Sequence, residues 1–133
     1  MKKIFILFAL FVVFNLAATD YIEYSHILNF YNEALDKEEN LNSFLGKNVN
    51  WRGIILNIVR QEGFDIIEVD LDVAGRNPAL SIKDVFFFID DKIAERLDNY
   101  QALFFTGVIK KIAIENNLPL IEIENVKIKG LMK

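Results

Sequence analysis

Residues 46–59, GKNVNWRGIILNIV, decide the fold, because they read as one long strand with a glycine in its middle. A near copy follows at residues 103–109, LFFTGVI. The two stretches share the spacing of three apolar residues and a glycine: Val49, Trp51, Gly53 and Ile55 in the first, and Leu103, Phe105, Gly107 and Ile109 in the second. Glycine inside a strand marks a bend or a close backbone approach. The repeat therefore predicts a small, curved barrel in which Trp51 is a core residue rather than a ligand platform.

The first eighteen residues have the form of a secretory signal. Lys2 and Lys3 precede an apolar run over residues 4–16, and small residues follow at Ala17 and Ala18. A membrane anchor is the alternative, but thirteen helical residues reach only about 20 Å, short of the roughly 30 Å hydrocarbon core. We expect cleavage near Ala18 and a periplasmic or secreted protein. Whether the segment is cleaved or retained as an anchor stays open.

Composition limits the classes of function. The chain has no cysteine, which excludes thiol chemistry, disulfides and a lipid anchor on cysteine. Its formal charge is −4, from 15 basic and 19 acidic residues. Without Lys2 and Lys3 the count is 13 against 19, a charge of −6. Nucleic-acid binders usually show the opposite balance, because phosphate contacts supply much of their affinity. One domain of residues 19–133 is expected.

The segment of residues 19–45 is predicted to be helical and to pack on the barrel. Its apolar residues recur mostly at steps of three and four over residues 25–39, with a short turn after Asn40. Ser25 is the candidate N-terminal cap, and Gly46 the terminator. His26, the only histidine, has no second histidine or cysteine as a partner for catalysis or metal binding.

Two strands are predicted over residues 48–60 and 64–73, joined by a short polar turn. The second strand alternates apolar residues with Glu68, Asp70 and Asp72. Residues at alternate positions lie about 6.6–6.8 Å apart along a strand, too wide for three carboxylates to hold one ion without help from a loop. We interpret the row as a solvated face that discourages edge-to-edge pairing, although a calcium site is not excluded.

A loop over residues 74–83 contains Arg76 and Asn77 and precedes a third strand at residues 84–89. In this strand Phe86 and Phe88 face away from Phe87 and its neighbours. We predict that Phe86 and Phe88 are buried under the N-terminal helix. If exposed, they would be stacking or partner-binding groups.

A short helix over residues 92–97, capped by Asp90 or Asp91, is followed by strands at residues 100–114 and 120–128. A change of face in the last strand predicts a bulge near Glu124 and Asn125. Three strands, a short helix and two further strands are typical of the OB-fold, a small, partly open Greek-key barrel. The sequence therefore predicts a mainly β protein, with a five-stranded OB-fold barrel over residues 46–133 and an additional N-terminal helix.

Short motifs support a resemblance to a known family. They are YNE at residues 31–33, GK at 46–47, VxWxGxI at 49–55, FTGVI at 105–109 and IEN at 123–125. Through them residues 26–128 resemble the tRNA-anticodon-like OB-fold family of exported bacterial proteins. The resemblance implies a small OB module without an established activity. It carries over no catalytic residue.

The function predicted from the sequence is that of a non-enzymatic, exported binding module of the bacterial cell envelope. Its partner would be an envelope protein, a glycan or a small molecule, with no cofactor and no metal. The alternative is a single-stranded nucleic-acid-binding OB domain, with basic residues on the backbone and phenylalanines stacking bases. The candidate binding residues are Arg52, Arg60, Arg76, Asn77, Phe86, Phe88, Lys110 and Lys111.

Overall fold

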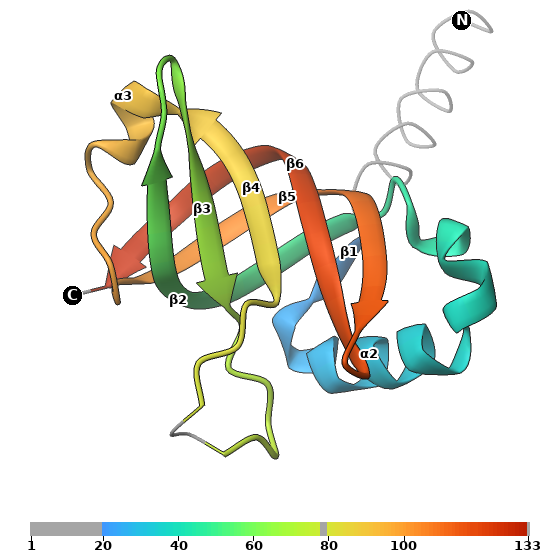
Figure 1. The fold of residues 1–133 in the computed structure, drawn as a ribbon. Helices are drawn as coiled ribbons and strands as arrows, with labels where there is room; N and C mark the ends of the chain where they lie inside the picture. Colours follow the sequence, from blue (N-terminus) through green and yellow to red (C-terminus); the bar gives the residue numbers. More distant parts are fainter. Residues whose placement is uncertain (1–19, 78–79, 133) are drawn as a thin grey trace, which may run out of the picture.

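The computed structural model describes residues 20–77 and 80–132, so the predicted signal lies outside the described residues. They form six strands, two α-helices and two 3₁₀ helices (Figure 1). The strands are β1 (Tyr21–Glu23), β2 (Asn48–Arg60), β3 (Phe64–Asp70), β4 (Val85–Asp90), β5 (Ala102–Glu115) and β6 (Leu118–Met132). The helices are η1 (Tyr24–His26), α2 (Ile27–Asp36), η2 (Glu38–Phe44) and α3 (Asp91–Ala94).

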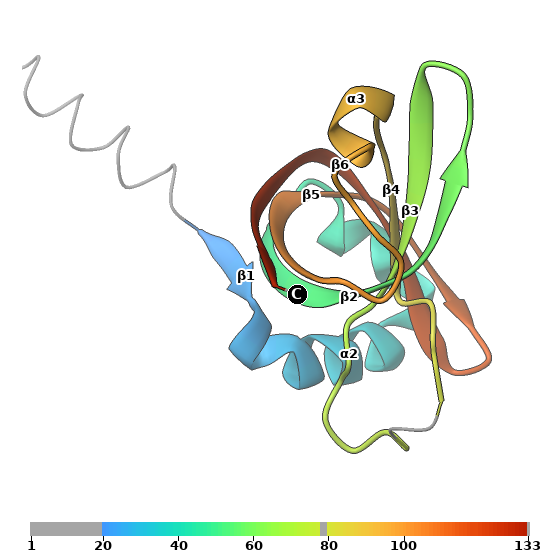
Figure 2. The same ribbon diagram turned by 90° about the vertical axis from the view of Figure 1, so that its left-hand side faces the viewer.

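Five of these strands close into a barrel. The order is β2-β3-β4-β6-β5, and β5 pairs back onto β2. All pairs in this ring are antiparallel except β4 with β6, which is parallel. Figure 2 shows β2, β5 and β6 curving around the interior. With α3 between β4 and β5 in the chain, this is the OB-fold architecture predicted from the order of elements.

The strand glycines sit where neighbouring strands approach most closely. A Cβ built on Gly53 would lie 2.5 Å from Val69 Cγ1 and 2.6 Å from the carbonyl oxygen of Asp70. A Cβ on Gly107 would overlap Ile123 Cγ2 and lie 3.0 Å from the carbonyl oxygen of Glu124. Both contacts are tighter than side chains tolerate, so glycine here permits close packing of β2 on β3 and of β5 on β6.

The barrel interior follows the alternation of the strands. Val49, Trp51 and Ile55 are buried on β2, and Ile67 and Val69 are buried on β3, as the period of two predicts. The core contains the large side chains Trp51, Phe44, Phe87 and Phe105. Trp51 is therefore confirmed as a core residue.

Strand β3 ends three residues before the predicted end. Asp72 has a positive φ of 53°, outside the strand region. Oδ1 of Asp70 accepts a hydrogen bond of 2.7 Å from the backbone N–H of Asp72. This side-chain turn satisfies the backbone locally, so the ladder stops at Asp70.

The predicted bulge in the last strand is present. Val108 pairs with Glu124 and Thr106 pairs with Lys127, which leaves one extra residue on β6. Asn125, in this gap, has a φ of 54°, which asparagine tolerates better than most residues. The bulge turns β6 and lets it continue along β5 to Met132.

The N-terminal segment contains a strand that the helical prediction missed. β1 pairs in parallel with β2, with Tyr21 opposite Asn48 and Glu23 opposite Asn50. Helix α2 then begins at Ile27 and has no side-chain N-cap, so the predicted cap at Ser25 is wrong. Asp90 does cap α3, by accepting a hydrogen bond of 2.8 Å from the backbone N–H of Lys92.

Helices α2 and α3 lie at opposite ends of the barrel in both ribbon views (Figures 1 and 2). The apolar face of α2 presents Phe30 to Phe44 and Trp51, with ring centroids 5.3 and 5.5 Å apart. Aromatic pairs at these distances stabilise a fold beyond the burial of their apolar surface. In the part of the chain that is described, no helix is both long and apolar enough to cross a membrane.

Candidate binding surface

Three phenylalanines form an aromatic cluster on the outer face of β3 and β4. Phe64 is 39% exposed, Phe88 is 46% exposed and Phe86 is partly buried. The Phe64 and Phe88 centroids are 5.7 Å apart, and those of Phe86 and Phe88 are 6.2 Å apart. We call Phe64, Phe86 and Phe88 the aromatic face.

Strand pairing explains why these rings meet. Ile66 of β3 lies opposite Phe88 of β4, and Glu68 lies opposite Phe86. Side chains of opposite residues share a face of the sheet, and the inner face of β4 is taken by Val85 and Phe87. Phe86 and Phe88 therefore point outward.

The prediction that Phe86 and Phe88 are buried under the N-terminal helix is wrong. Helix α2 covers the end of the barrel that holds Trp51, because its buried residues Phe30 and Tyr31 pack there. Among the described residues, no helix covers the outer faces of β3 and β4, and Phe88 is exposed.

The lysines beside the aromatic face are paired with acids. Nζ of Lys83 lies 3.1 Å from Oε2 of Glu68, and Nζ of Lys110 lies 3.3 Å from Oε2 of Glu122. Glu122 is opposite Phe86 in the sheet, so Lys110 belongs to the surroundings of the aromatic face. Lys111, also predicted, is exposed on β5 and makes no ion pair with any residue that the structure describes.

Arg60 is held at the end of β2, near α3. Its Nη1 donates to Oδ2 of Asp65 at 2.7 Å and to the carbonyl oxygen of Ala94 at 3.1 Å. The hydrogen bond from Arg60 lowers the pKa of the Asp65 carboxyl. Although the Arg60 side chain is half exposed, its guanidinium already links β2 to α3.

Arg76 anchors the loop between β3 and β4. Its guanidinium makes a two-pronged ion pair with the fully buried carboxylate of Asp84, where one of the two bonds measures 2.7 Å. The same carboxylate accepts hydrogen bonds of 2.7 Å from the Tyr31 hydroxyl and the backbone N–H of Leu71. Arg76 thus satisfies a buried charge, as a lone buried carboxylate requires. Asn77 is exposed in the same loop.

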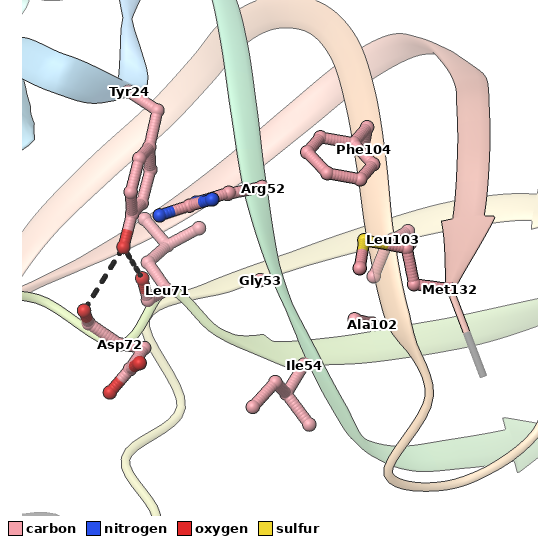
Figure 3. A pocket seen from close by; sticks show the side chains of 10 residues that line it. All are labelled: Tyr24, Arg52, Gly53, Ile54, Leu71, Asp72, Ala102, Leu103, Phe104 and Met132. Carbon is pink, nitrogen blue, oxygen red and sulfur yellow. Dashed lines mark hydrogen bonds between the residues drawn. The ribbon is translucent and has the colours of Figure 1, made fainter.

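Arg52 lies on the outer face of β2, away from the aromatic face. Its guanidinium is 4.6 Å from the centroid of the Tyr24 ring, a cation–π contact. The Tyr24 hydroxyl donates to the carbonyl oxygens of Leu71 at 2.8 Å and Asp72 at 3.0 Å. Figure 3 shows Arg52 pointing toward Tyr24 along a groove that Met132 closes on the other side. The groove holds about 180 Å³, below the usual range of ligand pockets.

The acidic residues that alternate along β3, Glu68, Asp70 and Asp72, do not act as one group. Oε1 of Glu68 accepts from Asn57 at 3.3 Å, and Oδ2 of Asp70 accepts from the backbone N–H of Ile82 at 3.1 Å. Asp72 lies beyond the end of the strand. Within residues 20–77 and 80–132, no group of three or more His, Cys, Asp or Glu side chains is placed to hold a metal ion.

The structure therefore brings together Phe86, Phe88 and Lys110 of the predicted site. Phe64 joins them, and sequence reasoning missed it. Phe64 could have been predicted from its position at the start of β3, because strand pairing places it opposite Asp90 and beside the ring of Phe88. Arg52, Arg60 and Arg76 lie elsewhere, each in contact with a ring or an acid.

Comparisons with known proteins support the fold but do not identify a family. No protein-family model matches the chain, and no curated protein sequence matches it. A crystal structure from Klebsiella pneumoniae, described as a "putative nucleic acid-binding lipoprotein", is similar at a TM-score of 0.52 and 18% identity. The match covers 87% of this chain and 96% of that one. The two proteins share the barrel architecture over nearly their whole lengths.

Proposed function

We propose that the protein is a non-enzymatic binding module of the bacterial cell envelope that engages its partner through the aromatic face. The observation that carries this proposal is the contact between Phe64, Phe86 and Phe88 at the surface of β3 and β4. Single exposed apolar side chains are ordinary, but a contiguous exposed group is typical of an interaction site. In OB-folds the outer face of the second and third barrel strands, here β3 and β4, is the usual ligand face.

The charges around the aromatic face favour a partner that is not a polyanion. Lys83 and Lys110 are each paired with a glutamate, and the chain as a whole is acidic. A protein segment or the apolar side of a sugar ring can pack on phenylalanine without requiring free cations. We therefore favour an envelope protein or a glycan as the partner.

A location in the envelope has two supports. The predicted signal at residues 1–18 is one, and the barrel shared with a protein described as a lipoprotein is the other. We also propose membership of the tRNA-anticodon-like OB-fold family, on the motifs given above. The non-enzymatic role is part of this proposal and rests on the sequence, in which His26 is the only histidine and has no second histidine or cysteine as a partner.

Single-stranded nucleic-acid binding is the second candidate, because aromatic rings on an OB face can stack bases. The description of the Klebsiella protein points the same way. Anisotropy titrations with labelled single-stranded DNA and RNA, at low and at moderate salt, separate the two functions. We expect no micromolar binding. Micromolar binding that weakens steeply with salt and disappears in Phe86→Ala/Phe88→Ala would establish the second candidate instead.

A further inference from the structure

A second surface, distinct from the aromatic face, lies between α3 and the C-terminal half of β6. It is a groove of about 460 Å³, within the usual range for ligand sites. Ile89 and Leu97 form its buried floor, and Ile93 and Leu131 are exposed at its rim. We call this the α3–β6 groove.

The groove opens along an unpaired strand edge. Strand β4 pairs with β6 only from Val85 opposite Ile121 to Phe87 opposite Ile123. Beyond Ile123, β6 pairs with β5 alone among the described residues. Residues 126–131 of β6 line the groove and present this free edge to it. A free edge offers backbone donors and acceptors to an added strand.

The groove also contains cations that contact no acid or aromatic ring within the described part of the chain. Most described lysines and arginines contact an acid or an aromatic ring: Lys37, Lys47, Arg52, Arg60, Arg76, Lys83 and Lys110. The described cations with neither contact are Lys92, Arg96, Lys111, Lys127 and Lys129. Of these five, Arg96, Lys127 and Lys129 line the groove, and none of the described acidic side chains does.

We propose that the α3–β6 groove binds an extended peptide segment in which acidic and apolar residues alternate, added as a strand to the edge of β6. Lys127 and Lys129 are both exposed on β6, on either side of the partly buried Ile128, and Lys129 is the extra residue of a bulge, since Phe105 pairs with Ile128 and Phe104 with Gly130. Acidic residues at alternate positions of an extended peptide lie about 6.6–6.8 Å apart on one face, so that two of them can face the two lysines. The apolar residues between them face the Ile93 and Leu97 side of the groove.

The test is an anisotropy titration of the purified protein with a labelled Val-Glu-Val-Glu-Val peptide, with Val-Lys-Val-Lys-Val as the control peptide. We expect only the acidic peptide to bind, more weakly as salt increases. Lys127→Glu/Lys129→Glu should lower affinity about tenfold or more. Lys92→Glu/Lys111→Glu carries the same change in net charge outside the groove and should bind as the unmodified protein does.

Amide hydrogen exchange separates this site from the aromatic face. The acidic peptide should slow exchange at residues 126–131 and leave Phe86 and Phe88 unchanged. Equal binding of both peptides, equal loss in both charge-reversal variants, or protection only at Phe86 and Phe88 would overturn the proposal. So would binding of anionic phospholipid vesicles or a single-stranded oligonucleotide at the groove without binding of the peptide. The function proposed for the aromatic face would survive any of these results.

Discussion

The hydroxyl of Tyr31 donates a 2.7 Å hydrogen bond to Oδ1 of Asp84, joining α2 to the end of the β3–β4 loop across 53 residues of sequence. Arg76 completes the arrangement by pairing with the same carboxylate. These three side chains hold the helix, the loop and the first residues of β4 together. The arrangement positions β4, and with it two residues of the aromatic face.

Asp84→Ala should lower the free energy of unfolding by about 3 kcal/mol, because it leaves the mostly buried Arg76 guanidinium with only the longer 3.6 Å pair to Asp70 and removes the acceptor of Tyr31 and Leu71. Urea unfolding measures the change. Glu33→Ala is the control, since it breaks the exposed Lys37–Glu33 pair and should cost no more than about 0.5 kcal/mol. Equal losses in the two variants would show that the buried pair does not stabilise the loop.

The stability of the protein should fall as pH rises above 10. Burial raises the pKa of Tyr31 well above its ordinary value of 10.0, and the Asp84 carboxylate raises it further. The folded state therefore keeps a proton that the unfolded state loses, so this contribution is complete below pH 10 and declines above it. Tyr31→Phe should be less stable than the unmodified protein at pH 8. Its free energy of unfolding should fall less as the pH rises from 9 to 11, because it has no hydroxyl to ionise. Parallel pH profiles of the urea midpoint in the two proteins would contradict this.

Gly53→Ala should destabilise the barrel by about 1–3 kcal/mol or more, since the new methyl group would meet the backbone of Asp70. Gly130→Ala is the matched control. Its Cβ would be 3.7 Å from Phe104, an ordinary contact, and the change should stay within about 0.5 kcal/mol. Thermal or urea unfolding compares them. If Gly53→Ala were as stable as Gly130→Ala, close approach of β2 and β3 would not be the reason for the glycine.

Export should remove the first eighteen residues. N-terminal sequencing of protein recovered from the periplasm or medium of a bacterial host is expected to begin at Thr19. A chain that keeps Met1 and sediments with membranes would instead favour a retained anchor.

Local sequence patterns predicted much of the barrel. The alternation around Trp51 and Gly53 defined β2 with the bounds that the structure has, and the change of face near Asn125 revealed the bulge in β6. Such features depend on neighbouring residues, so they can be read from one stretch of chain. β1 was missed because its three residues are too few to show a period.

Features that depend on distant residues were not predictable in this way. The sequence around Arg76 does not predict its contact with Asp84 and Tyr31, because the three residues come from different parts of the chain. Phe86 and Phe88 were correctly placed on a face opposite Phe87. What covers a face is decided by where α2 packs, and no local pattern encodes this.

The central claim, that the aromatic face binds an envelope partner, is tested most directly by quantitative capture from envelope extract with the purified protein and two variants. Phe86→Ser/Phe88→Ser removes two rings of the face, whereas Tyr100→Ser changes an aromatic residue that is 75% exposed elsewhere. A component retained by the unmodified protein and by Tyr100→Ser, lost with Phe86→Ser/Phe88→Ser and insensitive to nuclease is the predicted result. Equal capture by all three proteins, or capture abolished by nuclease, would contradict it.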